Sequence, residues 1–270
     1  MSVLVVIPAR YGSTRFPGKP LAPLAGKPMI QHVYEGAAGA SGVDEVVVAT
    51  DDTRIVAAVA QFGGKAAMTS LQARSGTDRV AEVARARSAQ VVINVQGDEP
   101  LIQPEMVGQL ADFLSRHQAV PMASLMTRLT QSEDLTNPNV VKVVVDRDGF
   151  ALYFSRASIP FDRNQEGSGL GARGSAQLSS AQSPQPRALY KHLGIYGYQR
   201  HFLLRFPSLE PTPLEQLEQL EQLRALEHGY RIKLLETTHD SIGVDTPDDL
   251  RRLEAMLQKS EVRNQKSEVA

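Results

Sequence analysis

The residues best suited to chemistry stand in the loop IPARYGSTRFPGKP (7–20), directly after an apolar run. The loop carries two glycines and three cations: Gly12, Gly18, Arg10, Arg15 and Lys19. Glycines let backbone N–H groups approach a ligand, and Arg and Lys supply positive charge for phosphate. A strand, a basic glycine-bearing loop and a helix predict an anion site at the edge of an α/β sheet. The alternative is an ordinary solvated basic loop, and the residue types favour phosphate over it.

Two later segments each place a short carboxylate where a strand or loop is expected to end. NVQGDEP (94–100) offers Asp98 after a fully apolar strand, and Gly97 allows a ligand to approach closely. GVDTP (243–247) offers Asp245 before the last predicted helix. Carboxylate oxygens suit Mg²⁺. Asp98 could instead belong to a turn, and the residues alone do not decide between the turn and a metal site. Asp245 could instead cap the next helix, and the residues alone favour that cap over a metal site.

Several function classes are excluded by what the chain lacks. It has no G-x-x-x-x-G-K-[ST] motif and no G-x-G-x-x-G after the first strand, which argues against P-loop and dinucleotide sites. It has no cysteine, so disulfides, thiolate metal sites and cysteine nucleophiles are absent. A net charge of −1 gives no reason to expect a nucleic acid polymer or a membrane as partner. We expect a soluble cytoplasmic protein, because the first apolar run is too short for a signal peptide.

The elements that must position these residues follow an alternating pattern in the first 116 residues. Apolar strands are predicted at 3–7, 43–50, 65–69 and 91–95, with helices between them, which indicates an open, mostly parallel α/β sheet. The pattern then changes to strands at 123–127, 140–145, 150–155 and 192–198, with a hairpin turn at 146–149.

We therefore expect one domain over 1–258. It contains a smaller inserted antiparallel β-rich subregion at 121–206, with a mobile insertion at 164–187, and a polar, frayed tail follows at 259–270. A helix is predicted over 214–228. Its leucines recur every three residues, so they wind around the helix and predict burial on more than one side.

Six motifs in order resemble the 3-deoxy-manno-octulosonate (Kdo) cytidylyltransferase family over residues 3–257. They are IPARYGSTRFPGKPL, SGTDR, NVQGDEP, YFSRA-IP, HLGIYGY with PLE--E-LEQLR, and GVDTP. Sialic acid cytidylyltransferases are similar only through IPAR, and the main departure from the Kdo family is 164–187. The resemblance implies a Rossmann-like nucleotide-diphospho-sugar transferase fold. It also implies transfer of CMP from CTP to Kdo, which yields CMP-Kdo and pyrophosphate and activates Kdo for lipopolysaccharide synthesis.

The resemblance also implies roles for particular residues. Arg10, Lys19 and Asp98 would be catalytic, and Asp98 and Asp245 would hold Mg²⁺ as the cofactor. The nucleotide would be bound by Ala9, Arg10, Gly12, Ser13, Lys19, Arg74, Ser75 and Gln96. The sugar would be bound by Arg156, His192, Tyr196, Glu215 and Glu218. From the residues alone, Ser75 is equally a helix cap. Arg156 is equally a surface cation, His192 equally the end of a strand, and Glu215 and Glu218 equally part of a solvated helical face.

Alternatives remain within and beyond this reading. The acceptor could be a related acidic sugar, such as 8-amino-Kdo or a sialic-acid-like sugar. A nucleotide-binding regulator without catalysis is disfavoured, because Arg10, Lys19, Asp98 and Asp245 are present together. The winding leucines further predict a homodimer with the 214–228 helix near the contact.

Overall fold

The computed structural model describes residues 1–12, 16–161 and 189–268, with side chains as far as residue 258 in the last helix. Ser13 and the insertion expected at 164–187 lie outside the described residues. None of the helices in the described ranges has the length and apolar character that a membrane span needs.

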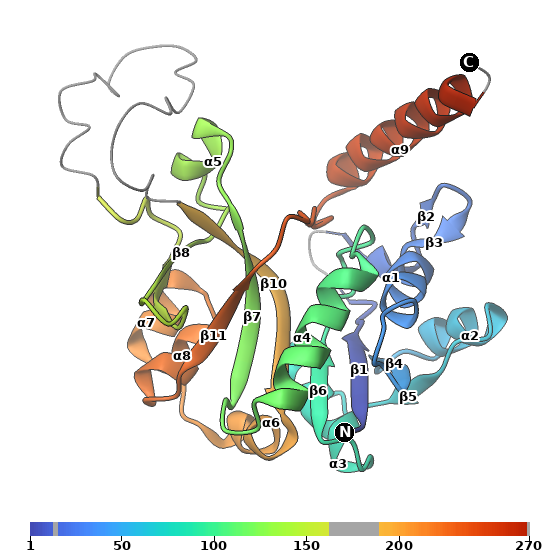
Figure 1. Cartoon of the computed structure of the whole chain (residues 1–270). Coiled ribbons are helices and arrows are strands. Elements are labelled where there is room, and N and C mark those ends of the chain that lie inside the picture. The colour runs from blue at the N-terminus through green and yellow to red at the C-terminus, as the bar shows by residue number, and fades with distance from the viewer. Residues whose placement is uncertain (13–15, 162–188, 269–270) are drawn as a thin grey trace.

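One sheet runs through the molecule (Figure 1). Its main path consists of β1 (Val3–Pro8), β4 (Glu45–Thr50), β5 (Ala66–Met68), β6 (Val91–Asn94), β7 (Met122–Arg128), β10 (Tyr190–Gln199) and β11 (Ile232–Glu236). The spatial order is β11-β7-β10-β6-β1-β4-β5, and β10 runs antiparallel to both of its neighbours while the other pairs are parallel. The prediction of a mostly parallel α/β sheet is confirmed, and the antiparallel part joins that sheet through β10.

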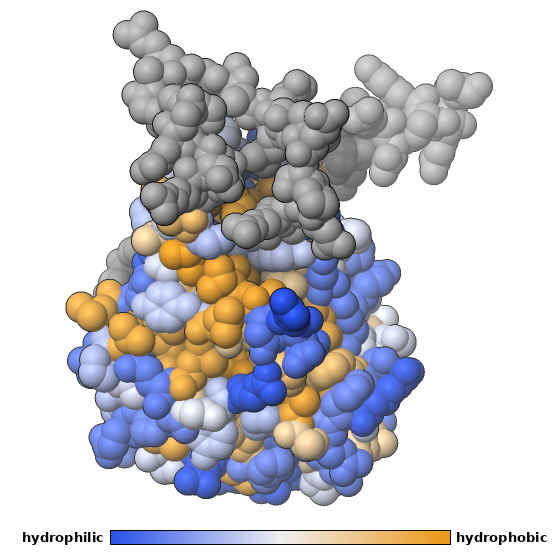
Figure 2. Space-filling view, turned by 60° about the vertical axis from the view of Figure 1, so that its left-hand side comes forward, coloured by the Kyte–Doolittle hydropathy of each residue, from blue (hydrophilic) through white to orange (hydrophobic). Residues whose placement is uncertain are grey.

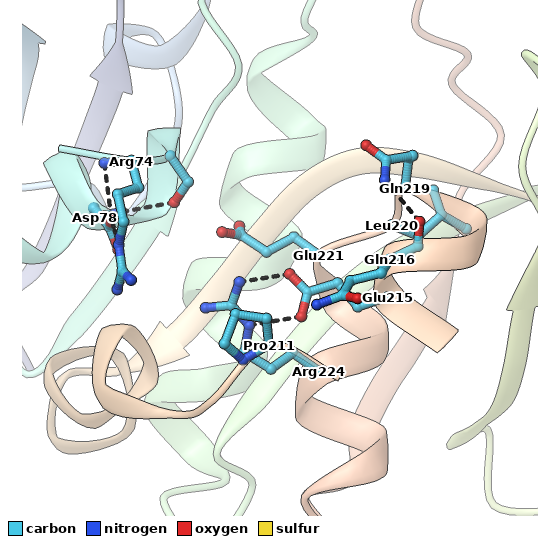
Figure 3. Close-up of a pocket in the computed structure, with 10 residues that line it drawn as sticks. Arg74, Asp78, Pro211, Glu215, Gln216, Gln219, Leu220, Glu221 and Arg224 are labelled. Atoms are coloured by element: carbon cyan, nitrogen blue, oxygen red, sulfur yellow. Dashed lines mark hydrogen bonds and ion pairs between the residues drawn. The ribbon is translucent and has the colours of Figure 1, made fainter. Parts of the chain in front are cut away.

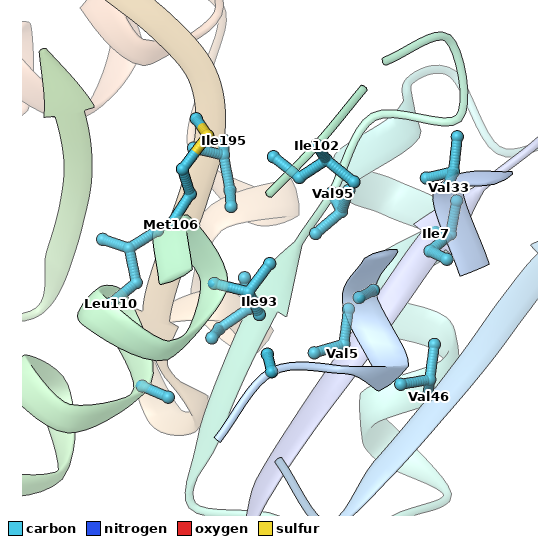
Figure 4. Close-up of a cluster of buried hydrophobic side chains, with 14 of the residues drawn as sticks. Val5, Ile7, Val33, Val46, Ile93, Val95, Ile102, Met106, Leu110 and Ile195 are labelled. Atoms are coloured by element: carbon cyan, nitrogen blue, oxygen red, sulfur yellow. The ribbon is translucent and has the colours of Figure 1, made fainter. Parts of the chain in front are cut away.

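Helices cover both faces of the sheet. They are α1 (Met29–Ala38), α2 (Thr53–Gln61), α3 (Gly76–Arg85), α4 (Pro104–Arg116) and α6 (Arg200–Arg205). Successive residues of a strand point to opposite faces. Val5 and Ile7 of β1 therefore pack in the layer with α1, α2 and α4 (Figure 4), while Leu4 and Val6 pack in the layer with α3 and α6. Burial on both faces explains the continuous apolar run of β1.

A hairpin of β8 (Lys142–Val145) and β9 (Ala151–Ser155) pairs with the start of β10. Its expected turn is confirmed: the Asp146 N–H donates to the Phe150 carbonyl at 2.8 Å, and Gly149 has φ +74°. The short elements elsewhere are η1 (Lys19–Leu21), β2 (Pro23–Leu24), β3 (Lys27–Pro28), α5 (Ser132–Thr136) and η3 (Phe206–Ser208). The first helix, α1, begins at Met29, directly after β3, which pairs with β2.

The prediction of one helix over 214–228 is wrong. Two short helices, α7 (Pro213–Glu218) and α8 (Gln222–Glu227), are separated at Gln219, which has the left-handed φ of +54°. Leucines spaced by three cannot share one face of an unbroken helix. The break turns the second segment so that Leu220 and Leu223 enter the core, while Leu217 is left 80% exposed.

The chain ends in α9 (Pro247–Glu268), a helix that projects from the body of the molecule (Figure 1). The expectation of a frayed tail is wrong in this respect, because the helix continues to Glu268. Leu253 packs with Leu24, Met29 and Val244 in a small cluster, which anchors the start of α9 beside the first loop.

Candidate active site

Backbone hydrogen bonds hold the loop after β1. Buried Ala9 donates its N–H to a carbonyl of β4 at 2.9 Å, and Gly18 donates to the Tyr11 carbonyl at 2.9 Å. Gly18 has φ +73°, and a Cβ there would lie 3.2 Å from the Tyr11 ring, so glycine suits this position on both counts. Arg10 is exposed, and the space where Gly12 would carry a Cβ is open. The loop thus offers a cation and open backbone at the carboxyl end of β1.

Lys19, Asp98 and Asp245 come together although they are far apart in the sequence. Lys19 Nζ lies 2.7 Å from a carboxylate oxygen of Asp98 and 3.5 Å from one of Asp245. Lys19 also donates to the Val244 carbonyl at 2.8 Å, and the Val244 N–H donates to the Asp98 carbonyl at 2.8 Å. Two carboxylates from different loops therefore converge on one cation.

Thr246, and not the Asp245 carboxylate, caps α9. The Thr246 hydroxyl accepts from the Asp249 N–H at 3.2 Å, and the Asp249 carboxylate accepts from the Thr246 N–H at 2.9 Å. Hydrogen bonds to this carboxylate lower the pKa of Asp249, although burial acts against them as the largest single influence. The reading of Asp245 as a helix cap is therefore wrong, and its carboxylate is directed to the Lys19 side.

The donor set fits Mg²⁺ that is shared with a nucleotide. The described part of the chain contains no group of three or more His, Asp or Glu side chains that could hold a metal ion by itself. Mg²⁺ in nucleotide sites takes one or two protein carboxylates and completes its octahedral shell with phosphate oxygens and water. Asp98 and Asp245 have side chains that are 34% and 50% exposed, so phosphates can reach them.

Glu99, next to Asp98, is almost fully buried. Burial raises its pKa to about 7, a hydrogen bond from the Ser241 hydroxyl opposes this, and the charges of Asp98 and Asp240 add to the rise.

The loop before α3 meets the Asp98 loop at the end of β1. A Cβ on Gly76 would lie 3.3 Å from the Pro8 ring, and a Cβ on Gly97 would lie 2.7 Å from the Pro8 carbonyl oxygen. Ser75 caps α3 by accepting from the Asp78 N–H at 3.2 Å, as the sequence predicted. Arg74 is exposed, and its guanidinium donates to the carbonyl of Pro207 at 3.3 Å. The predicted phosphate, base and metal motifs thus share one sheet edge.

A buried polar network beyond Gln96 was not predicted. Gln96 donates to Asn94 at 3.4 Å, and the buried Tyr198 lies near the side chains of Asn94 and Thr77. Thr77 in turn donates to Glu221. Burial raises the pKa of Tyr198 well above its usual value, so it stays protonated. Asn94 inside an apolar strand was the sequence signal for this network.

Two buried amide groups of this region have no partner for their nitrogen within the described residues. They are Asn94 Nδ2 and Gln222 Nε2, in side chains that are 1% and 3% exposed. The Gln222 oxygen accepts from the Tyr196 hydroxyl at 3.1 Å. Burial raises the pKa of Tyr196, so this hydroxyl remains a donor. Buried donors without partners indicate a place for a polar ligand or a water molecule.

His192 lies beside this network in β10. Its Nε2 is 2.8 Å from the Ser124 hydroxyl, which also lies 2.7 Å from the Ile195 carbonyl. Because a hydroxyl has one hydrogen and the carbonyl can only accept, Nε2 is assigned as the donor to Ser124 and Nδ1 as an acceptor. Burial lowers the pKa of His192 to about 3, so the ring is neutral and offers no positive charge to a sugar carboxylate.

Other predicted sugar residues are bound by the protein itself. Arg156 donates from its guanidinium to the carbonyls of Glu218 (2.7 Å), Pro138 (2.9 Å) and Gln219 (3.4 Å). Glu218 accepts from the Ser155 hydroxyl at 2.6 Å and from the Arg156 N–H at 2.9 Å. These contacts tie the hairpin to the break between α7 and α8, and the sugar role of both residues stays a prediction.

Glu215 and Arg224 form an ion pair with two hydrogen bonds, one of them 2.8 Å long. Their side chains are 13% and 10% exposed. Both line a cavity of about 440 Å³ between α3 and the helices α7 and α8 (Figure 3). The lining also includes Arg74, Ser75 and Glu221. The structure thus brings Ser75, predicted for the nucleotide, and Glu215, predicted for the sugar, to one cavity, where Glu215 is already paired.

Comparison with known proteins assigns the family. Residues 4–233 match the family model described as cytidylyltransferase. The chain is 53% identical to the 3-deoxy-manno-octulosonate cytidylyltransferase of Syntrophotalea carbinolica, over 95% of this chain and 99% of that protein. It is 52% identical to the protein of the same name from Geobacter sulfurreducens, over 94% and 98%.

Solved structures agree with this assignment. A structure of CMP:2-keto-3-deoxy-manno-octonic acid synthetase complexed with CTP superposes with a TM-score of 0.85 and 43% identity, covering 96% of this chain and all of that one. A cytidylyltransferase from Leptospira borgpetersenii shares the fold alone, with a TM-score of 0.61 and 15% identity. The chain belongs to the cytidylyltransferase family and, within it, to the 3-deoxy-manno-octulosonate cytidylyltransferases.

Proposed function

We propose that this chain transfers CMP from CTP to Kdo at the sheet edge that carries Lys19, Asp98 and Asp245. The anomeric hydroxyl oxygen of Kdo forms a bond to the α-phosphorus, and the bond from that phosphorus to the bridging oxygen of the β-phosphate breaks. Pyrophosphate leaves, and the hydroxyl proton passes to solvent. The observation that carries the proposal is the convergence of the Asp98 and Asp245 carboxylates on Lys19.

The protein contributes mainly charge and position at the phosphate end. Arg10 and Lys19 neutralise the β- and γ-phosphates, and the backbone at Ala9 and Gly12 borders the nucleotide. Asp98 and Asp245 would hold Mg²⁺, which when bound supplies positive charge to the triphosphate and to the attacking oxygen. No side chain is assigned as a general base.

Arg74, Ser75 and Gln96 are proposed to face the nucleoside. Ser75 and Gly76 lie across Pro8 from the Asp98 loop, so base and phosphates can be bound from one strand end. The sugar then occupies the side of β10, where the buried amides of Asn94 and Gln222 offer donors. His192 and Tyr196 flank that position as neutral groups.

The proposal includes a homodimer and a cytoplasmic location. Figure 2 shows an apolar area on the face turned forward there. Three large apolar side chains are mostly exposed: Leu152 on β9 (62%), Phe161 after β9 (73%) and Leu217 on α7 (80%). Large exposed apolar side chains on one part of a protein suggest a protein contact. Light scattering at micromolar concentration should report a dimer.

A cytoplasmic location agrees with CTP as substrate and with the absence of cysteine.

Pyrophosphate release with a panel of nucleoside triphosphates and acidic sugars tests the reaction. We expect release only with CTP and Kdo together. If the enzyme turns over CTP with 8-amino-Kdo or a sialic acid in preference to Kdo, that sugar is the acceptor and the assignment of Kdo is wrong. Tight CTP binding without release for any sugar would contradict catalysis.

A further inference from the structure

The segment 237–246 crosses from the end of β11 to the start of α9 and carries Asp245 (Figure 1). Hydrogen bonds and an ion pair hold this segment to the rest of the protein along its length. Thr237 donates its N–H to the Met126 carbonyl of β7 at 2.9 Å, and Asp240 pairs with Lys191 of β10 at 2.5 Å. Val244 is bonded to the Asp98 carbonyl and to Lys19. The position of Asp245 therefore depends on how this segment is held over the sheet.

One further hydrogen bond joins the Asp98 loop and the segment 237–246 through side chains. The Ser241 hydroxyl donates to Glu99 Oε2 at 2.8 Å. Glu99 adjoins Asp98, and Ser241 lies four positions before Asp245. Only 9% of Glu99 is exposed, so water cannot easily replace the serine as its donor.

A glycine in β10 leaves the room that Glu99 needs. The pairing of β10 with β7 shifts register between Leu193 and Tyr196, a stretch that contains Gly194. A Cβ on Gly194 would lie 2.9 Å from Glu99 Oε1, closer than side-chain carbons approach such atoms. The backbone of the Asp98 loop is confined on its other side, because a Cβ on Gly97 would lie 2.7 Å from the Pro8 carbonyl oxygen. The loop is therefore held between β1 and β10, with Glu99 reaching out to Ser241.

We infer that Glu99 and Ser241 are positioning residues that set the distance between Asp98 and Asp245 and so determine how well the pair binds a divalent cation with CTP. Neither residue contacts the cation or the nucleotide in this inference. It rests on the proposed role of Asp98 and Asp245 as the metal-binding pair. Groups that orient metal ligands typically contribute 10- to 100-fold to metal affinity.

The test measures metal binding, with no turnover. Mn²⁺ replaces Mg²⁺ as a paramagnetic probe, and its dissociation constant for the complex of the full chain with CTP is measured by electron paramagnetic resonance without sugar. Ser241→Ala should raise this constant about 10-fold. Ser241→Thr, which keeps the hydroxyl, should restore it to within about 3-fold of the wild-type value. CTP binding without a divalent cation should not change in either variant.

Two further variants complete the design. Gly194→Ala should raise the same constant, because its methyl group displaces Glu99 without touching Ser241. Ser70→Ala is the control: it removes a serine hydroxyl from a different loop, where that hydroxyl accepts a hydrogen bond from the Gln72 N–H, and it should leave Mn²⁺ binding unchanged. A merely structural role would lower the melting temperature of the metal-free protein without changing the constant.

Asp98→Asn separates the failure of this inference from that of the proposed function. If Asp98→Asn abolishes Mn²⁺ binding while Ser241→Ala binds Mn²⁺ as the wild type does, the positioning role is overturned and the metal assignment stands. If Asp98→Asn itself binds Mn²⁺ normally, the metal assignment fails and the inference fails with it. Weaker CTP binding by Ser241→Ala in the absence of metal would also overturn the inference, because the pair would then act on the nucleotide.

Discussion

The two ends of the site use charged side chains in opposite ways. At the phosphate end, Lys19 lies between the partly exposed Asp98 and Asp245, and Arg10 is exposed. At the sugar end, Glu215 is paired with Arg224, and Arg156 donates to three backbone carbonyls. The first arrangement leaves charge that a triphosphate and a cation can take over, whereas the second has its charges already satisfied by the fold.

A residue that matches a family motif can therefore act in two ways, as a direct ligand of the substrate or as a support for the pocket. A charged group whose contacts a ligand can replace is suited to bind that ligand directly, whereas a buried group with several protein partners mainly holds the shape of the pocket. We therefore propose that the sugar end recognises its substrate with neutral donors and acceptors, such as His192, Tyr196 and Gln222. The following predictions test this division, from the largest expected effect to the smallest.

Glu215→Gln should destabilise the protein by about 3 kcal/mol, because Arg224 loses its hydrogen-bonded partner and keeps only the more distant charges of Glu221 and Asp78. The free energy of unfolding from urea titration measures the effect. Asp112→Asn is the matched control: it breaks the exposed pair of Asp112 with Arg116 and should cost less than about 1 kcal/mol. Normal stability together with a raised KM for Kdo would instead make Glu215 a direct ligand and break the division between the two ends.

Asp98→Asn and Asp245→Asn should each lower kcat at least ~10²-fold, by analogy with the removal of one electrostatic stabiliser. Stability should hardly change, since both carboxylates are partly exposed. The double variant should be little worse than either single one, because groups that act as a unit are not additive. Titrating kcat with Mg²⁺ in all three variants checks this, and a fully active Asp245→Asn with normal metal dependence would remove Asp245 from the site.

The sequence predicted the parts of this molecule that local chemistry determines. Apolar runs located β1, β4 and β6, and Ser75 was expected as the cap of its helix. A short carboxylate after an apolar strand suggested Asp98, because ligands gather at the carboxyl edge of parallel strands. Asp245 was suggested only by the family resemblance, because the residues alone favoured a helix cap there.

What the sequence could not predict depends on contacts between distant segments. The break at Gln219 is fixed in part by Arg156, which binds the carbonyls of Glu218 and Gln219 from more than 60 positions away. The pairing of Glu215 with Arg224 requires that break, since the two lie nine positions apart in separate helices. Their satisfied state was therefore invisible in the spacing that suggested free sugar ligands.

Arg156→Ala should cost about 1.5–3 kcal/mol for its charged hydrogen bonds, and the loss should appear first in stability. The resemblance that named Arg156 a sugar ligand predicts in addition a KM for Kdo that rises far more than the KM for CTP. Arg156→Lys keeps the charge without the guanidinium geometry that serves three carbonyls. If the lysine variant restores the KM for Kdo while stability stays low, Arg156 contacts the sugar carboxylate. If the two properties are lost together in both variants, Arg156 only holds the break.

The smallest expected effect is a pH dependence that His192 gives to folding. Burial holds its pKa at about 3 in the folded protein, whereas an unfolded histidine titrates near 6.5. Between these values the unfolded chain binds the extra proton, so stability falls as the pH drops through this window, by at most about 1.4 kcal/mol per pH unit for one proton.

Urea unfolding of wild type and His192→Gln at pH 7, 6 and 5 isolates this contribution, because other groups titrate alike in both proteins. The stability advantage of the variant should grow as the pH falls, since glutamine takes up no proton. His201→Gln, on the exposed side of α6, controls for removal of a histidine and should give a constant difference. If His192→Gln also differs from the wild type by a constant amount, His192 takes up its proton in the folded protein at the same pH as in the unfolded chain, near 6.5. It would then be available as a cation for the sugar carboxylate, and the neutral character assigned to the sugar end would be wrong.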